Sequence, residues 1–134
     1  SKLADFSAYT VSETLTKETI KTIYDQHQFL VDPHTAVGIK AYQMYQSDTQ
    51  DQTKTIVLST ASPLKFSDSV LSSLSMPISN DALINIKTLS GLNQDIADKR
   101  AFEYLNTKIK KIVWSKNEAL DKLKKLVGDL DVNN

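Results

Sequence analysis

Residues 55–66 read TIVLSTASPLKF, and this stretch decides how the chain can fold. The first four residues are β-branched or apolar, a pattern typical of a short buried strand. Small hydroxyl residues follow, and Pro63 then prevents the strand from continuing. Beyond Pro63, the apolar side chains at 66, 70, 71 and 74 recur at helical spacing. The stretch therefore predicts a strand, a polar turn and a helix, in a helix-rich α/β protein.

The polar turn is a candidate binding site. Ligands of α/β proteins usually bind at the carboxyl ends of strands, where loops carry polar groups. Hydroxyls at Ser59 and Thr60 suit hydrogen bonding to a ring nitrogen or an oxyanion of a ligand. The same hydroxyls, together with that of Ser62, can instead cap the following helix. The spacing alone leaves both interpretations open.

A second stretch, FLVDPHTAVG at residues 29–38, predicts the start of another helix. Asp32 is a good N-cap residue, and Pro33 is preorganised for the first helical position. The positive end of the helix would then lie near Asp32, His34 and Thr35.

The two stretches together resemble threonine synthase, a pyridoxal-phosphate enzyme of fold type II. The usual pattern of that family is DPHTAVG, then a strand, then TAHPAKF. Here Ser62 stands where the family has histidine, and Leu64 stands where it has alanine. The likeness is close over residues 29–66, moderate over residues 10–28 and weak after residue 74.

The resemblance implies an architecture as well as a family. We expect the α/β C-terminal part of a fold-type-II enzyme, with one strand and about six helices. Residues 1–134 are expected to be a single C-terminal fragment of a larger enzyme, an expectation that the absence of an initial methionine supports. Residues 1–75 resemble the C-terminal portion of the cofactor domain, and residues 76–134 form a C-terminal helical region.

The resemblance also implies a reaction, the conversion of O-phosphohomoserine and water to threonine and phosphate. This carbon–oxygen lyase of threonine biosynthesis needs a Schiff-base lysine and a glycine-rich phosphate loop. The glycines at 38, 91 and 128 are remote from one another, and no lysine stands in a Schiff-base motif. We therefore expect the fragment alone to contain no catalytic residue, to bind no cofactor and to be inactive. Its partner would be the missing N-terminal part of the same enzyme.

One part of the cofactor site is expected here. By resemblance Thr60 meets the pyridine nitrogen of pyridoxal phosphate, and Ser59 is the neighbouring candidate. A hydroxyl can donate to a neutral pyridine nitrogen but cannot keep it protonated as a carboxylate would. The cofactor would then be a milder electron sink.

Further residues of the motifs are expected near the active site: His34, Thr35, Ser62 and Lys65. Each has a plainer interpretation as well. His34 can stabilise the turn, Lys65 can simply be solvated, and Ser62 lacks the imidazole of the family residue. Asp32 is interpreted as a helix cap.

Composition excludes several classes of function. The chain has no cysteine, and its formal net charge is zero, so we expect neither a nucleic-acid nor a membrane partner. No apolar run approaches the roughly 18 residues that span a bilayer, and we expect a cytoplasmic protein. Asp32 with His34, or His27 with His34, would lack a third metal ligand, so no metal site is expected.

The apolar periodicity predicts six helices, with bounds taken from capping residues. They are Thr16 (cap) to His27, Pro33 to Tyr45, Phe66 to Leu74, Ser79 or Asn80 (cap) to Gly91, Asn93 or Asp95 to Trp114, and Lys116 to Gly128. An alternative function follows from this helical content. The chain could be a non-catalytic helical interaction module, in which the apolar positions of residues 96–130 bind a partner helix.

Overall fold

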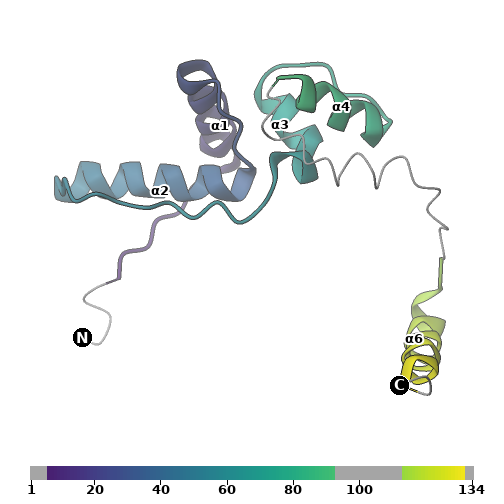
Figure 1. The fold of residues 1–134 in the computed structure, drawn as a ribbon. Coiled ribbons are helices and arrows are strands. Elements are labelled where there is room, and N and C mark those ends of the chain that lie inside the picture. The colour runs from purple at the N-terminus through teal and green to yellow at the C-terminus, as the bar shows by residue number, and fades with distance from the viewer. Residues whose placement is uncertain (1–5, 93–112, 132–134) are drawn as a thin grey trace.

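The computed structural model describes residues 6–92 and 113–131. Figure 1 shows the elements that these residues form. They are five α-helices and one 3₁₀ helix: α1 Glu13–His27, α2 Pro33–Thr49, η1 Pro63–Phe66, α3 Ser67–Ser73, α4 Ala82–Leu92 and α6 Lys116–Asp131.

Helix α1 begins one turn earlier than its sequence predicts. Ser12 is the N-cap, and its hydroxyl accepts the Leu15 N–H at 3.3 Å. The hydroxyl of Thr16, which we expected to cap the helix, instead donates to the Ser12 carbonyl at 2.9 Å. Ser12 and Thr16 are both residues that can cap a helix, and the earlier of the two, Ser12, is the N-cap. The helix ends at His27 as predicted.

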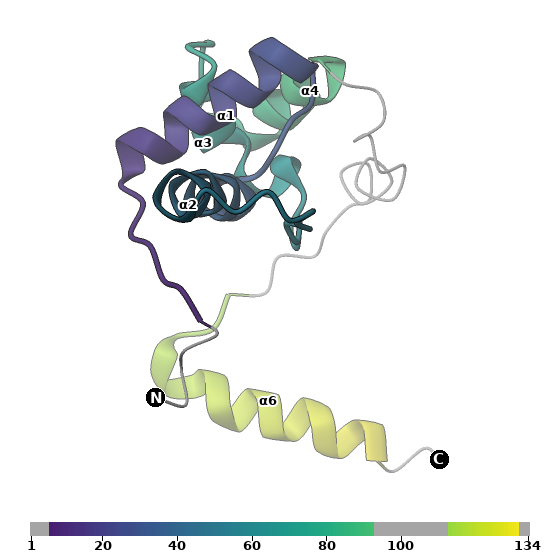
Figure 2. The same ribbon diagram turned by 90° about the vertical axis from the view of Figure 1, so that its left-hand side faces the viewer.

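Helix α2 begins at Pro33, as its cap residues predict, and runs one turn past Tyr45 to Thr49. It crosses α1, and Figure 2 views it along its axis. The two helices are joined by a short link whose side chains Leu30 and Val31 are buried in the core. The start of α2 is thereby held against the core.

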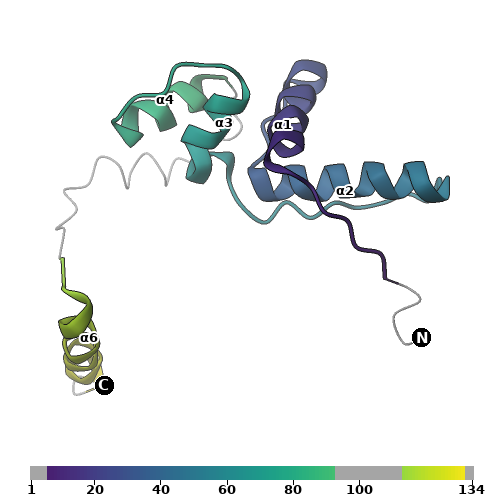
Figure 3. The same cartoon turned by 180° about the vertical axis from the view of Figure 1, so that it is seen from behind.

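The α/β prediction is wrong for the part of the chain that the structure describes, because residues 6–92 and 113–131 contain no strand. Residues 51–62 are extended but run alone beside α2 (Figures 1 and 3). The expected buried strand is exposed, with Ile56 88% and Leu58 77% accessible. A strand is defined by hydrogen bonds to a neighbour, and no neighbouring strand is present among the described residues. The fold described here is mostly helical.

The core lies where α1, α2, η1, α3 and α4 meet. Its buried apolar residues are Ile20, Leu30, Val31, Ala36, Leu64, Val70, Leu71 and Leu89. The predicted helix over residues 66–74 is observed as η1 followed by α3, because Ser62 and Pro63 start a tight turn that includes Leu64 and Phe66. This core fixes η1 beside the start of α2.

Helix α4 starts at Ala82 and continues through Gly91 to Leu92, so Gly91 does not end it as predicted. The helix predicted from Asn93 or Asp95 lies outside the described residues, except Val113 and Trp114, which are not helical. The last helix, α6, starts at Lys116 as predicted but passes Gly128 to end at Asp131. The apolar side chains of α6 are half exposed or more: Leu120, Leu123, Leu126 and Val127.

Candidate functional site

The start of α2 is built on one buried carboxylate. Asp32 is fully buried, and its Oδ1 accepts the N–H groups of His34 at 2.9 Å and Thr35 at 3.3 Å. These bonds satisfy N–H groups that a helix start leaves without partners. The predicted capping role of Asp32 is confirmed.

The hydroxyl of Thr35 joins the two sequence motifs. It donates to Asp32 Oδ2, and it also lies 3.2 Å from the Ser59 hydroxyl, within hydrogen-bond distance. Thr35 is buried, whereas Ser59 is exposed at the end of the extended segment. A residue of the DPHTAVG motif therefore holds the polar turn of the second motif at the positive end of α2.

A second contact between the motifs involves aromatic rings. The His34 imidazole meets the Phe66 ring edge to face, with centroids 5.1 Å apart and planes at 73°. The Lys65 ammonium lies 5.6 Å from the centroid of the same ring. His34 and Lys65 are exposed. Phe66 was absent from the predicted site residues, although it ends the second motif and its position there was the available signal.

The hydroxyls of Thr60 and Ser62 differ in their hydrogen bonding. Ser62 caps η1, since its hydroxyl accepts the Leu64 N–H at 3.3 Å and its carbonyl accepts the Lys65 N–H at 3.1 Å. The capping interpretation therefore accounts for Ser62. Thr60 is exposed, and within the described part of the chain its hydroxyl has no hydrogen-bond partner. Thr60 is thus able to donate to an external acceptor, while the Ser59 hydroxyl is already engaged by Thr35.

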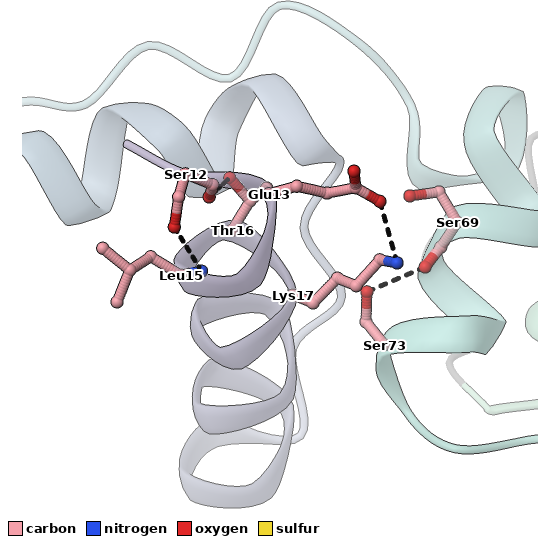
Figure 4. A network of polar contacts seen from close by, with 7 residues as sticks. All are labelled: Ser12, Glu13, Leu15, Thr16, Lys17, Ser69 and Ser73. Atoms are coloured by element: carbon pink, nitrogen blue, oxygen red, sulfur yellow. Dashed lines mark hydrogen bonds and ion pairs between the residues drawn. The ribbon is translucent and has the colours of Figure 1, made fainter. Parts of the chain in front are cut away.

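Another surface groove lies away from the motifs, between α1 and α3. It measures about 440 Å³ and is lined by Glu13, Thr14, Lys17, Glu18, Lys21, Ser72 and Ser73. Lys17 pairs with Glu13 at 2.9 Å and points toward Ser69 and Ser73 (Figure 4), and Lys21 pairs with Asp25 at 3.0 Å. Because its lysines already have carboxylate partners, we place the candidate site at the two motifs and not at this groove.

A smaller groove adjoins the motif residues. It measures about 390 Å³ and is lined by Leu64, Lys65, Phe66, Ser67, Asp68, Ser69, Ala82 and Ile86. Phe66 thus belongs both to this groove and to the contact with His34, and Lys65, which lies over the Phe66 ring, also lines the groove.

The motif residues fit one end of pyridoxal phosphate and not the other. The exposed Thr60 hydroxyl suits the pyridine nitrogen. The phosphate, in contrast, requires a glycine-rich loop, and the three glycines of the chain all lie inside helices: Gly38 in α2, Gly91 in α4 and Gly128 in α6. This chain therefore offers a hydroxyl suited to the pyridine nitrogen but no glycine-rich loop for the phosphate.

Among the residues that the structure describes, no three histidine or carboxylate side chains gather closely enough to hold a metal ion. Over the same residues, no helix has the length and apolar character needed to cross a bilayer.

Comparison with known proteins points to one family. The family model described as "Threonine synthase, C-terminal" matches residues 35–127. The chain is similar to threonine synthase of Saccharomyces cerevisiae, with 42% identity over 76 residues that cover 53% of this chain and 15% of the relative. It is also similar to threonine synthase of Schizosaccharomyces pombe, with 43% identity over 72 residues, 53% of this chain and 14% of the relative. The chain thus matches about one seventh of the length of these relatives.

Proposed function

This chain belongs to the threonine synthase C-terminal family, and from that premise we propose that it acts as the C-terminal portion of a threonine synthase. The reaction converts O-phosphohomoserine and water to threonine and phosphate. Residues 1–75 contribute the two motifs to the cofactor domain, and residues 76–134 form a C-terminal helical region. As part of an enzyme of threonine biosynthesis, the protein works in the cytoplasm.

One observation carries the proposal. The DPHTAVG motif and the STASPLKF motif, more than twenty residues apart, meet through the 3.2 Å contact between Thr35 and Ser59. A free-standing helical module would not need two polar motifs joined at a helix start. The mostly helical fold suits that alternative, but the family match over residues 35–127 favours the enzyme.

Each residue of the site has a stated part in the proposal. The Thr60 hydroxyl donates to the pyridine nitrogen, and Ser59 fixes the turn that presents Thr60. Asp32 and Thr35 hold this turn at the positive end of α2, where N–H groups favour negative charge. Pyridoxal phosphate, when bound, supplies the electron sink for bond cleavage at the substrate carbons.

Two exposed cationic or basic groups face the same region, His34 and Lys65, both against the Phe66 ring. We assign them to the surroundings of the anionic substrate, because a phosphate ester attracts such groups. The Schiff-base lysine and the phosphate loop come from the N-terminal part of the enzyme, so the 134-residue chain alone is inactive.

The role of Thr60 is tested in a chimera, in which this chain replaces the matching segment of the S. cerevisiae enzyme. Thr60→Val removes the donor at nearly unchanged shape, and Thr60→Ser restores it. We expect the valine variant to shift the visible absorption of the bound cofactor and to lower kcat about a hundredfold, in the range for loss of one positioned polar group. The serine variant should recover most of both properties. If the parent, valine and serine chimeras had equal spectra and equal kcat, Thr60 would not contact the cofactor.

A further inference from the structure

The extended segment between α2 and η1 is held on α2 by every second side chain. Val57 lies against the helix, where its Cγ1 is 3.2 Å from the position that a Cβ on Gly38 would occupy. Two residues on, the Ser59 hydroxyl lies 3.2 Å from the Thr35 hydroxyl at the start of the same helix. Figures 1 and 3 show the segment running beside α2. Positions 57 and 59 therefore form the face that contacts the helix.

The positions between and beyond these two form the opposite face. Successive side chains of an extended chain point to opposite sides, so Ile56, Leu58 and Thr60 point away from α2. All three are exposed, Ile56 to 88% and Leu58 to 77%. We call these three side chains the outer face of the segment. Two large apolar side chains thus share a face with the hydroxyl that the proposed function assigns to the pyridine nitrogen.

The outer face has the character of a binding surface. Neighbouring apolar side chains that are exposed to water mark sites of interaction. Between Lys54 and Pro63 the sequence TIVLSTAS contains no charged residue. Among the described residues, no hydrogen bond between backbone groups joins residues 54–61 to another segment. A partner surface that is apolar and uncharged would therefore match the outer face.

We propose, on the basis of the function proposed above, that the outer face binds an uncharged apolar surface on the part of the enzyme that carries the cofactor. Leu58 and Thr60 are two residues apart, a separation of roughly 7 Å in an extended chain. An occupant that lies on Ile56 and Leu58 therefore also lies beside the Thr60 hydroxyl. The cofactor-carrying part can cover both apolar side chains and at the same time bring the pyridine nitrogen to Thr60.

A second copy of this chain does not meet both requirements. By lying on Ile56 and Leu58 it would cover the approach to Thr60, yet it would supply no glycine-rich loop for the phosphate. The matched regions are only 15% of the S. cerevisiae enzyme and 14% of the S. pombe enzyme. Most of such an enzyme thus lies outside the matched region and is available to cover the outer face.

Thiol alkylation tests this assignment, because the chain has no cysteine of its own. Ile56→Cys and Leu58→Cys are each made in the 134-residue chain and in the chimera with the S. cerevisiae enzyme. Mass spectrometry of the labelled peptide gives the alkylation rate in each protein. We expect both thiols to react at least about tenfold more slowly in the chimera, because a thiol at a covered interface reacts only when the interface opens locally.

Two further positions serve as matched controls. Thr22→Cys, at an exposed position of α1, should react at the same rate in the isolated chain and in the chimera. Val57→Cys lies in the same segment but faces α2. Its thiol should also react at the same rate in both proteins, and more slowly than that of Leu58→Cys in the isolated chain. Protection specific to positions 56 and 58 would thus identify the outer face as the covered one.

The possible failures are distinguishable. Equal alkylation of Leu58→Cys in the isolated chain and the chimera would overturn the assignment of the outer face, even if the chimera formed threonine. Protection in the isolated chain that grows from about 10 to about 300 μM, a range that detects weak association, would assign the face to a second copy and also overturn it. Protection in a chimera that forms no threonine would support the binding face and contradict the proposed function alone.

Discussion

Thr35 shows how one side chain connects two motifs. Its hydroxyl bonds to the buried Asp32 carboxylate and contacts the Ser59 hydroxyl. The cap role of Asp32 was predictable, because aspartate before proline at a helix start has a local cause. The contact with Ser59 joins residues 24 positions apart, and no local pattern indicates such a contact. The candidate residues were thus readable from the motifs, but their arrangement was not.

Replacing Thr35 by valine should destabilise the fold at nearly constant volume. The variant loses the bond to Asp32 and leaves a buried carboxylate with fewer donors, which costs about 1–3 kcal/mol. Urea unfolding followed by circular dichroism measures the change. Thr22→Val, at an exposed position of α1, is the control and should change stability by less than about 0.5 kcal/mol. Equal stability of the two variants would mean that Thr35 is not a structural link.

Asp51 provides a residue-scale prediction of pH dependence. The Thr53 hydroxyl, the Thr53 N–H and the Tyr45 hydroxyl all donate to its carboxylate, and they hold its pKa below the usual value. A lowered pKa in the folded state means that the stabilisation is present above the pKa of the unfolded chain, near 3.9. It is lost as the pH falls through the lower, folded-state pKa.

In Asp51→Asn, the free energy of unfolding should therefore decrease less on acidification than it does in the parent chain. Urea midpoints between pH 6 and pH 2.5 should fall less steeply for Asp51→Asn than for the parent chain. Asp81→Asn is a useful comparison, since Asp81 is exposed, whereas Asp51 is half-buried, and Asp81 too accepts a backbone N–H, that of Leu83 at 2.9 Å. If the slope for Asp51→Asn matched the parent slope, the hydrogen bonds of Asp51 would not contribute to stability.

At the scale of elements, Gly38 determines how the extended segment lies on α2. A glycine inside a helix costs about 1 kcal/mol relative to alanine. The structure gives a reason for it, because an added Cβ would lie 3.2 Å from Val57 Cγ1. The close approach at Gly38 is thus made by a side chain of the extended segment and not by its backbone.

Gly38→Ala should raise the melting temperature by a few degrees, because Val57 lies on a segment without strand hydrogen bonds and can move by the few tenths of an ångström required. Gly38→Val should lower it, since a branched side chain cannot fit in the same space. Thermal unfolding of both variants provides the measurement. A loss of stability with alanine would show that the segment is rigidly held.

The loop between α3 and α4 depends on Asn85. This side chain is buried, donates to Asp68 Oδ1 and to the Ser79 carbonyl at 2.8 Å each, and accepts the Ser79 N–H at 2.7 Å. Asn85→Leu should cost about 2–3 kcal/mol, because it leaves these groups without partners. Asn80→Leu, at an exposed position of the same loop, should have little effect on the urea midpoint. Similar midpoints for the two variants would contradict this role.

The starts of α2 and α6 and the end of α1 were predicted correctly because their signals are local. The strand was not, because four apolar residues in a row become a strand only when another segment pairs with them. Residues 55–58 have the composition of a buried strand, yet the described residues supply no pairing segment and Ile56 stays exposed. The prediction that Gly91 and Gly128 end α4 and α6 was also wrong. A helix can continue through glycine at a modest cost, so a glycine alone does not determine where a helix ends.

At the scale of the whole molecule, the helical core and the joined motifs are consistent with a part that completes a larger active site. The exposed Thr60 hydroxyl and the His34 and Lys65 side chains on Phe66 lie at or near one end of the extended segment, and the exposed Ile56 lies in its middle. The family model matches residues 35–127, and this match supports the proposed function.

Phosphate release from O-phosphohomoserine, with matching formation of threonine, tests the central claim most directly. The assay compares the S. cerevisiae enzyme lacking its matching segment with the same enzyme carrying this chain in that place. We predict no activity for the truncated enzyme and recovered, equimolar phosphate and threonine for the chimera. A chimera that binds the cofactor and has the helical content of the parent enzyme, yet forms no threonine, would contradict the assignment of this chain to the enzyme's active site.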